Sequence, residues 1–262
     1  MKHLLVHLLS FLLSVSAFSW QNSVNIPRSG SLKSLAPTQL SYELSWNGRL
    51  KAGNIDMIFG KKDPRYPKHY LAQAWGGSTG WAHVLYPFQF NYISFLNPRT
   101  LRPLMFSGNE IARKRTSTYN FRFTSKNVTG TKKVDKGGKG KNRTEKRTFK
   151  YPNTLDLFSG LLQIRSLPLL PGQTYRMPFY PVGKPYLATI KVLGREKHLG
   201  RSALKLNLTM ERIDDNMRLK NYEKLKGATV WISDDQWRIP LEVRAAVFVG
   251  DVRMRLTEQK AL

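Results

Sequence analysis

The sequence contains no cysteine, and this absence excludes several kinds of chemistry. Without thiols the chain forms no disulfide, holds no iron–sulfur cluster and has no cysteine ligand for zinc. It also lacks the cysteine to which a bacterial lipoprotein attaches its lipid. Histidine is scarce, and beyond the first 19 residues it occurs only at His69, His83 and His198. No H-E-x-x-H zinc motif and no G-x-x-x-x-G-K phosphate loop is present, so we predict no enzymatic activity, no metal and no cofactor.

Acidic residues are few compared with basic ones. The chain has 43 Lys and Arg against 17 Asp and Glu, which gives a net charge of +26 at pH 7. This excess indicates affinity for polyanions, and outside the cytoplasm these are anionic lipids and envelope polymers. A proteome whose exported proteins are generally basic explains the same charge without a dedicated partner, and the sequence leaves both explanations open.

Long apolar runs are absent except at the N-terminus, which has the layout of a secretory signal peptide. Met1-Lys2-His3 is a positive start, residues 4–18 are mostly apolar, and Ala17-Phe18-Ser19 forms a site for cleavage before Trp20. Val15-Ser16-Ala17 offers an alternative cut two residues earlier. The apolar run is shorter than the ~20 residues that cross a bilayer core, which argues against a retained anchor. We expect residues 1–19 to be cleaved near Ser19/Trp20 and the mature chain to have no transmembrane segment, although a membrane β-barrel gives too weak a signal to be excluded.

Alternating apolar and polar residues predict an antiparallel β protein. After a flexible leader at 20–39, alternation begins at Leu40 and continues to Trp46. Asn47-Gly48 then predicts a hairpin turn, because both residue types tolerate positive φ. A change of phase at Gly53 predicts a β-bulge. Later strands are predicted over 69–75, 104–111, 119–123, 175–180, 187–193, 204–210, 228–232 and 239–248. The last two are expected to form a hairpin through Asp234-Asp235, followed by a bulge at Gly250.

Two helices are predicted between these strands. From Trp81 to Leu96, apolar residues recur at spacings of three and four, which is typical of a helix with one buried face, and Pro87 should kink it. The second helix is predicted to begin at Asn153 as its cap, with Asp156 at the third helical position as in a capping box.

Residues 125–150 are strongly basic. Ten Lys and Arg stand there against Asp135 and Glu145, with glycines at 137, 138 and 140. Like charges repel and glycine disfavours order, so we predict a mobile loop or hairpin tip. The candidate residues for binding an anionic surface are Lys132, Lys133, Lys136, Lys139, Lys141, Arg143, Lys146 and Arg147. An ordinary solvated loop remains the alternative. Interleaved aromatics are missing, so no specific nucleic-acid binding is predicted.

Short alternating strands with only two helices indicate a mainly β fold, a large curved antiparallel sheet or incomplete β-barrel. No internal repeat or second linker divides the chain. We therefore predict one β-rich domain over 40–257 and a short tail at 258–262.

In this order of blocks the chain resembles the bacterial domain of unknown function 3108 family of exported proteins. The opening block is 40–53, the middle block is 155–172 and the closing block is 230–250. The matching residues treated as structural are Trp46, Gly48, Gly53, Asp156, Ser159, Arg165, Gly172, Trp231, Asp234, Asp235, Arg238, Pro240 and Gly250. The resemblance implies an exported β-rich domain in the periplasm or cell envelope. It implies no catalytic residues, because the family has no established activity.

The acidic residues in these blocks favour structural roles. Asp234 and Asp235 are neighbours, and neighbouring residues on a strand point to opposite faces, so turn chemistry explains them better than a pair of catalytic carboxylates. Asp156 is expected to start a helix. Arg165 and Arg238 are expected to pair with these acids inside the fold.

The architecture offers an apolar hollow, and we predict Trp75, Trp81, Phe88 and Tyr92 at its mouth. Apolar clefts with few polar groups bind small ligands. The sequence therefore favours a non-enzymatic envelope protein that binds an apolar or amphiphilic, lipid-like ligand or an envelope partner. A structural or interaction module without a small ligand, and less so an envelope hydrolase, remain the alternatives. The ligand, the pathway and the oligomeric state do not follow from the sequence.

Overall fold

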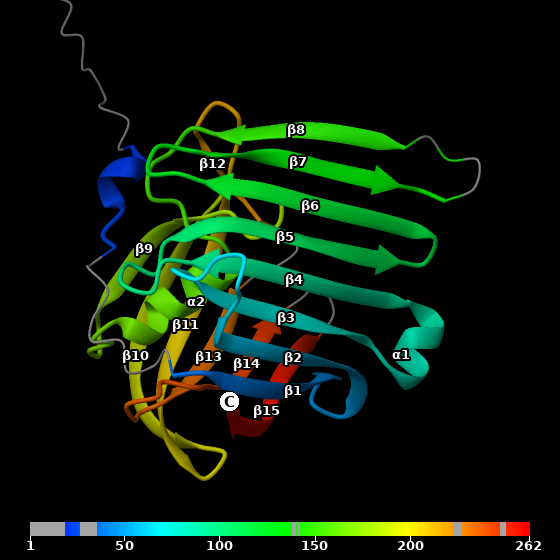
Figure 1. Cartoon of the computed structure of the whole chain (residues 1–262). Coiled ribbons are helices and arrows are strands. Elements are labelled where there is room, and N and C mark those ends of the chain that lie inside the picture. The colour runs from blue at the N-terminus through cyan, green and yellow to red at the C-terminus, as the bar shows by residue number, and fades with distance from the viewer. Residues whose placement is uncertain (1–18, 27–35, 138–139, 141, 223–226, 247–249) are drawn as a thin grey trace, which may run out of the picture.

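The computed structural model describes residues 19–26, 36–137, 140, 142–222, 227–246 and 250–262. The predicted signal peptide therefore lies, except for Ser19, outside the described residues. Fifteen strands form one antiparallel sheet that curves around a helix (Figure 1). This confirms the mainly β fold class.

The first half of the sheet is a meander in which every strand pairs with the next. Its eight strands are β1 (Thr38–Trp46), β2 (Leu50–Lys62), β3 (Tyr70–Ser78), β4 (Phe88–Leu96), β5 (Pro103–Ala112), β6 (Arg115–Phe123), β7 (Val128–Asp135) and β8 (Arg143–Phe149). The short helix α1 (Gly80–Leu85) joins β3 to β4.

The second half continues the sheet from the other side of β1. Its strands are β9 (Thr174–Phe179), β10 (Tyr186–His198), β11 (Arg201–Ile213), β12 (Leu219–Asn221), β13 (Gly227–Ser233), β14 (Pro240–Ala246) and β15 (Asp251–Ala261). The helix α2 (Leu157–Ser166) connects the two halves. The last strand, β15, pairs with the first, β1, so the two meanders form a continuous sheet with β8 and β9 at its edges.

The sheet does not close between these two edges. The chain after β8 crosses the gap, because the Leu155 amide donates to Pro178 O at 3.0 Å and the Tyr180 amide donates to Leu155 O at 2.7 Å. Phe149 on β8 also stacks on Tyr180, with ring centroids 6.1 Å apart. The segment that leads into α2 thus bridges the opening and places the helix against the concave face.

Local turn chemistry in the first hairpin is as predicted. Asn47 and Gly48 have φ of 49° and 67°, and Trp46 pairs with Leu50 across the turn. The register then shifts after Leu44, which faces Gly53, so the predicted bulge is confirmed. Asn and Gly adopt positive φ at little energetic cost, and they therefore form the turn. The alternation of apolar and polar residues in the two flanking strands determines which side chains face inward.

The predicted helix from Trp81 to Leu96 is wrong in most of its length. Only Gly80–Leu85 is helical, and Phe88–Leu96 forms β4. Phe88, Phe90 and Tyr92 recur at a two-residue period as well, and this pattern is the one realised because β4 pairs with β3 and β5 along its length. Tertiary pairing therefore overrode a helical spacing that spanned Pro87.

The basic segment at 125–150 is mostly sheet rather than a mobile loop. Val128–Asp135 and Arg143–Phe149 are paired as β7 and β8, with Lys132 opposite Glu145. Of the described residues in this segment, those at 125–127, those of the connection at 136–142 and Lys150 lie outside the strands. The threonine, valine and phenylalanine residues interleaved with the charges explain this, since their side chains favour a pleated surface.

Four other expectations need correction at their boundaries. The helix α2 begins after Asp156, which is its N-cap, instead of at Asn153. Gly250 lies in the connection before β15, because Ala246 pairs with Asp251, and so it is not a bulge. The expected tail belongs to β15 as far as Ala261. The leader is not uniformly flexible, because Trp20–Ser23 forms a 3-10 helix whose buried Trp20 donates to Met217 O at 2.8 Å.

Candidate ligand-binding site

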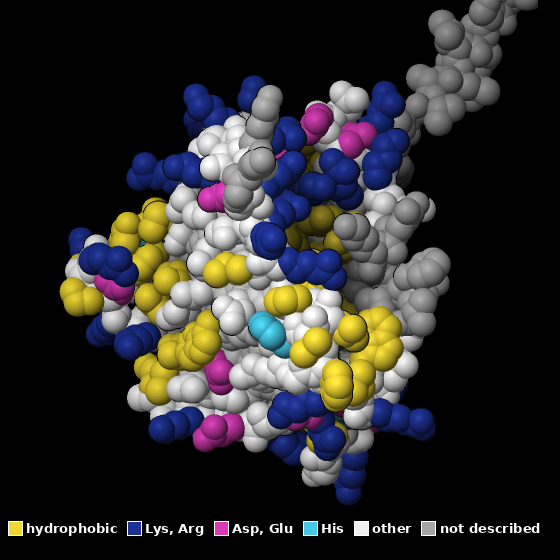
Figure 2. All heavy atoms as spheres, turned by 90° about the vertical axis from the view of Figure 1, so that its right-hand side faces the viewer, with side chains coloured by type: hydrophobic (Ala, Val, Ile, Leu, Met, Phe, Trp, Pro, Cys, Tyr) yellow, Lys and Arg dark blue, Asp and Glu magenta, His cyan; other side chains and the backbone are white. Residues whose placement is uncertain are grey.

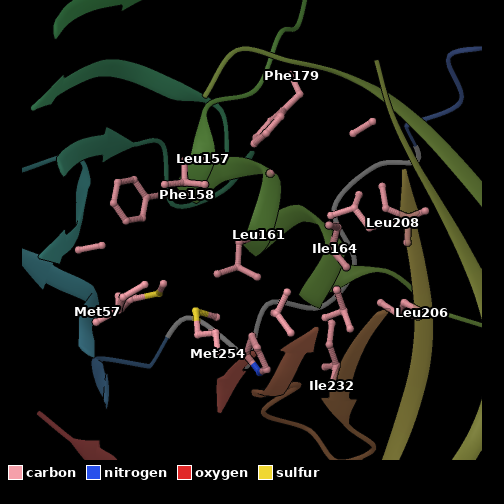
Figure 3. Close-up of a pocket in the computed structure, with 18 of the residues that line it drawn as sticks. Met57, Leu157, Phe158, Leu161, Ile164, Phe179, Leu206, Leu208, Ile232 and Met254 are labelled. Atoms are coloured by element: carbon pink, nitrogen blue, oxygen red, sulfur yellow. The ribbon is translucent and has the colours of Figure 1, made fainter. Parts of the chain in front are cut away.

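An apolar cavity of about 350 Å³ lies between the concave face of the sheet and α2. Figure 3 shows Leu157, Leu161 and Ile164 of α2 on one side, with strand residues such as Met57 and Met254 across from them. The described residues that line it include no charged side chain, and their only polar side chains are two tyrosines. The lining residues are Tyr42, Ile55, Met57, Ala74, Phe90, Tyr92, Leu157, Phe158, Gly160, Leu161, Ile164, Met177, Phe179, Ala188, Ile190, Leu206, Leu208, Met210, Val230, Ile232, Pro240, Val243 and Met254.

A capping box fixes the start of α2. The Asp156 carboxylate accepts a hydrogen bond from the Ser159 amide at 2.7 Å, and the Ser159 hydroxyl accepts one from the Asp156 amide at 2.7 Å. The Ser94 hydroxyl of β4 donates to the other oxygen of the same carboxylate. Asp156 is wholly buried, and this burial raises its pKa. Asp156 therefore ends the segment that bridges the two sheet edges, caps α2, and connects the helix to β4 through Ser94.

Arg165 fixes the other end of α2. Its guanidinium donates to Trp237 O at 2.9 Å and to Arg238 O at 3.1 Å, in the turn between β13 and β14. The same group lies 5.5 Å from the centre of the Phe59 ring. Burial lowers the pKa of Arg165 to about 10. The helix is thus held at both ends, which keeps the cavity between it and the sheet.

The turn that receives Arg165 is built by the predicted acidic pair. The Asp235 carboxylate accepts hydrogen bonds from the amides of Trp237, at 2.9 Å, and Arg238, at 3.1 Å. Asp234 faces Arg195 at 2.7 Å and Arg238 at 3.5 Å. Burial of Asp235 favours its protonated form, but the bonds from Ser233 and these amides outweigh it and hold the pKa below its usual value. The two acids therefore act in a turn, as their sequence predicts.

The four aromatic residues predicted for the mouth are not together. Tyr92 lines the cavity, whereas Trp75 follows the inward Ala74 on β3 and so points to the other face. Phe88 lies on the inner side next to Phe90, with ring centroids 6.0 Å apart, but outside the lining. Trp81 is 75% exposed on α1. The prediction missed the residues of the second half of the sheet that line the cavity, because only the pairing of β1 with β15 places that half opposite the first.

Sequence reasoning also missed one pentapeptide of catalytic type, since residues 76–80 match G-x-S-x-G. Ser78 ends β3 ahead of α1, and its hydroxyl lies 3.2 Å from His83 Nδ1. That hydroxyl is also 3.0 Å from Tyr86 O and accepts from the Phe88 amide at 2.9 Å. A nucleophile elbow holds its serine in a strained turn, but Ser78 is not among the described residues with positive φ. Within the described chain no carboxylate bonds to His83. These contacts make Ser78 a residue that closes the β3–β4 connection.

The predicted basic surface is split by strand alternation. Lys132 and Lys133 are neighbours on β7, so they point to opposite faces, and Lys133 is exposed. Arg143, Glu145 and Arg147 share one face of β8, and Lys146 lies on the other. Lys136 follows β7, and Lys139 and Lys141 lie outside the described residues. The run therefore does not form a single patch.

The described residues contain neither a candidate metal site nor a membrane-spanning helix. Within them, no cluster of three or more Asp, Glu or His side chains is arranged to hold a metal ion. No helix in that part of the chain is both long and apolar enough to cross a bilayer.

A family model described as "Protein of unknown function (DUF3108)" matches residues 41–257. The chain belongs to this family. No curated protein matches it.

Two solved structures match the chain to different degrees. The β-barrel-like protein of domain of unknown function DUF1849 from Brucella abortus has a TM-score of 0.56 at 10% identity, over 87% of this chain and 98% of that chain. At this identity the likeness shows the fold alone. The Mycobacterium tuberculosis lipoprotein LppX has 12% identity over 86% of each chain and a TM-score of 0.28, which is too low to carry an argument.

The DUF3108 blocks of the sequence meet around α2. The opening block forms the β1–β2 hairpin, with Trp46, Gly48 and Gly53 at the turn and bulge. Tyr42 from the same block donates to Pro240 O at 3.1 Å in the closing block. Gly172, with φ of 84°, ends the connection from α2 to β9. These residues therefore lie in the turns and contacts that hold the strands in place around the cavity.

Trp231 points away from the cavity, because it lies between Val230 and Ile232, which line it, and neighbouring residues on a strand point to opposite faces. Its indole donates to Glu196 at 2.7 Å and stacks on His198, with ring centroids 4.2 Å apart. Lys205 and Arg244 lie over the same ring. This cluster stabilises the face of β10–β14 that is turned away from α2.

Proposed function

We propose that this DUF3108 chain is a non-enzymatic binding protein of the cell envelope that holds an apolar or amphiphilic, lipid-like ligand between the sheet and α2. The observation that carries the proposal is the cavity of about 350 Å³, which no charged side chain of the described chain lines. Protein interiors are normally packed to near-crystalline density, so a space of this size inside an apolar wall is a feature that folding alone does not favour.

The chemistry of the wall selects the ligand class. Buried waters need several polar partners, and the lining supplies only the hydroxyls of Tyr42 and Tyr92. Tyr42 already donates to Pro240 O, and Tyr92 donates to Glu110. An acyl chain or similar apolar group would supply the van der Waals contacts that the lining residues lack, and it would leave no buried polar atom unpaired. Methionines at 57, 177, 210 and 254 adapt to irregular apolar shapes.

The experiment uses a neutral apolar fluorophore, N-phenyl-1-naphthylamine, with the full chain. We expect its fluorescence to rise on binding. Leu161→Trp fills the cavity from α2 and should reduce this binding about tenfold, since it removes most of the space that the probe occupies. Leu170→Trp is the matched control, because Leu170 is 51% exposed after α2.

Native mass spectrometry of protein purified from the envelope provides a second readout. Co-purified lipid agrees with the proposal. A bare mass, together with absence of probe binding by the unaltered chain, contradicts it and leaves an interaction module as the better explanation.

We further propose that an anionic lipid surface is the partner, and that α1 and its surroundings contact it. Trp81, Val84 and Leu85 of α1 are each more than 70% exposed, and Tyr86 follows them. Arg113 lies over Tyr86 at 5.7 Å and donates to Leu85 O at 3.0 Å, so basic and apolar side chains are interleaved. Figure 2 shows this side of the molecule, where hydrophobic side chains are grouped among Lys and Arg. Exposed apolar groups of this kind mark interaction sites, and the positive charge fits anionic head groups.

Co-sedimentation with vesicles tests this partner. We expect retention on phosphatidylglycerol-containing vesicles and much weaker retention on vesicles of phosphatidylcholine alone. The double change Trp81→Ser and Leu85→Ser should abolish most of it. Leu199→Ser, at an exposed apolar residue of the β10–β11 turn, is the control. Equal retention of the double variant would rule out α1 as the contact.

A further inference from the structure

The inner wall of the sheet changes from apolar to charged along a single cross-strand row. The register places Met57 opposite Ala74, and Ala74 opposite Tyr92. The same row continues through Gly108 and Tyr119 to Lys132 on β7 and Glu145 on β8. Directly paired residues in a sheet lie on the same face, so Lys132 is on the face that lines the cavity.

Direct contacts connect the cavity to Lys132. Tyr92 lines the cavity and donates its hydroxyl to Glu110, and Tyr119 donates to the other oxygen of Glu110 at 2.7 Å. The Lys132 ammonium lies 5.2 Å from the centre of the Tyr119 ring. Gly108 makes room for this arrangement, because a Cβ there would lie 2.4 Å from Tyr92 Cδ1. Contacting side chains therefore connect the apolar lining at Tyr92 to the ammonium group of Lys132.

Positive charge collects at the far end of this row. The connection between β9 and β10 comes over it, and a Cβ on Gly183 would lie 3.9 Å from Lys132 Cδ. Burial lowers the pKa of Lys132, and repulsion by Arg115 and Lys184 lowers it further, against the attraction of Glu110 and Glu145. Figure 2 shows a hollow whose floor is hydrophobic and whose rim carries Lys and Arg side chains.

The two carboxylates nearby are already engaged. Glu110 accepts from both tyrosines, and Glu145 pairs with Arg143 at 3.1 Å and with Arg147. Within the described chain, Lys132 takes part in no ion pair within 4.0 Å. The group of Lys132, Arg115 and Lys184 thus outnumbers the acids that face it and has unused capacity for an anion.

We propose that the amphiphile held in the cavity has an anionic head group, and that Lys132, with Arg115 and Lys184 beside it, receives this head group on the inner wall of β6–β7. The proposal rests on the binding function proposed above. Its chemical class is a single-chain acidic amphiphile with a carboxylate or phosphate head. The tail lies against the apolar wall beyond Tyr92, and the charge lies three strands away along the row.

The experiment compares two probes with one tail, palmitate and hexadecanol, by their displacement of N-phenyl-1-naphthylamine at pH 8 and low salt. We expect the unaltered chain to prefer palmitate by about tenfold, which is the value of one charge-assisted contact. Lys132→Gln should reduce the preference to about twofold or less, mainly by weakening palmitate. Lys132→Arg should restore most of it.

Lys133→Gln is the matched control, because Lys133 is the adjacent lysine on the opposite face of β7. It changes the net charge equally and should keep the preference. If Lys132→Gln does not fold, as judged by near-ultraviolet circular dichroism, Lys184→Gln on the exposed connection replaces it and should lower the preference in the same direction.

The outcomes separate this proposal from the binding function. Equal affinity of the unaltered chain for palmitate and hexadecanol, or a preference that survives Lys132→Gln and Lys184→Gln, overturns the head-group site while leaving the cavity function intact. Failure of both probes to displace the fluorophore, or of the fluorophore to bind, overturns both proposals.

Discussion

The Ser94 hydroxyl on β4 donates a hydrogen bond to the Asp156 carboxylate at the start of α2, and both side chains are fully buried. Sixty-two residues separate the two in the chain. The contact fixes the helix above the concave face at the one point where the chain passes from the first half of the sheet to the second. The position of the cavity follows from it.

Removing the hydroxyl should destabilise the fold. Ser94→Ala leaves a buried carboxylate oxygen without its donor, so we expect a loss of about 1–3 kcal/mol in the free energy of unfolding. Urea denaturation followed by tryptophan fluorescence measures it. Ser202→Ala, at an exposed serine of β11, should change the value by less than about 0.5 kcal/mol. Equal effects of the two substitutions would contradict the role of the contact.

Asp156 and Asp235 should give opposite pH dependences of stability. Burial raises the pKa of Asp156, so the folded state binds a proton more readily than the unfolded state, and stability falls as pH rises from 3.8 through the folded pKa. Asp235 has a lowered pKa, so its contribution is present above 3.8 and is lost as pH falls through the folded pKa.

Melting temperatures between pH 3 and pH 8 check these signs. Compared with the unaltered chain, Asp156→Asn should gain relative stability as pH rises, because the asparagine still caps the helix without a buried charge. Asp235→Asn should be less stable at pH 7 and converge with the unaltered chain near pH 3. Parallel curves for all three proteins would show that neither carboxylate titrates differently on folding.

Arg165 should be essential to the second attachment of α2. Arg165→Met removes the donors to Trp237 O and Arg238 O, and we expect a cost of roughly 2–4 kcal/mol for these two charge-assisted bonds. Chemical denaturation measures it, and fluorophore binding in the still-folded protein should weaken as the helix loosens. Arg255→Met on β15, where the arginine is exposed, provides the comparison. A cost below about 0.5 kcal/mol would mean that packing alone holds the helix.

The β7–β8 hairpin should tolerate loss of its connection but not of its strands. Replacing residues 136–142 with Asn-Gly should change stability by less than about 1 kcal/mol, because the pairs from Val128–Phe149 to Val134–Arg143 remain. Deleting residues 132–147 should prevent folding, since it exposes the edge of β6 and its buried aromatic side chains. Circular dichroism and expression yield distinguish the two, and a folded deletion variant would contradict the strand assignment.

Short-range chemistry made part of this structure predictable. Asn47-Gly48 supplies a turn through its own tolerance of positive φ, and Asp235 forms a turn with amides two and three residues away. The sequence places Asp156 in the first turn of a helix, whereas the structure shows it as the N-cap. The errors arose where two periods fit the same residues, as in Phe88–Leu96, and where charge density hid an alternating strand, as at Lys132.

The sequence by itself determined that the chain is largely a series of antiparallel hairpins, because turn residues and two-residue alternation act over a few neighbouring positions. It did not determine which face of each strand curves inward, or that α2 stands off from the sheet and leaves a cavity. Those features were decided by contacts between residues far apart in the chain, such as Tyr42 with Pro240, Ser94 with Asp156 and Arg165 with the β13–β14 turn. Alternation places the side chains of each strand on two faces. Only the pairing of β1 with β15 joins the two halves into one curved sheet, and this makes one of the faces the interior.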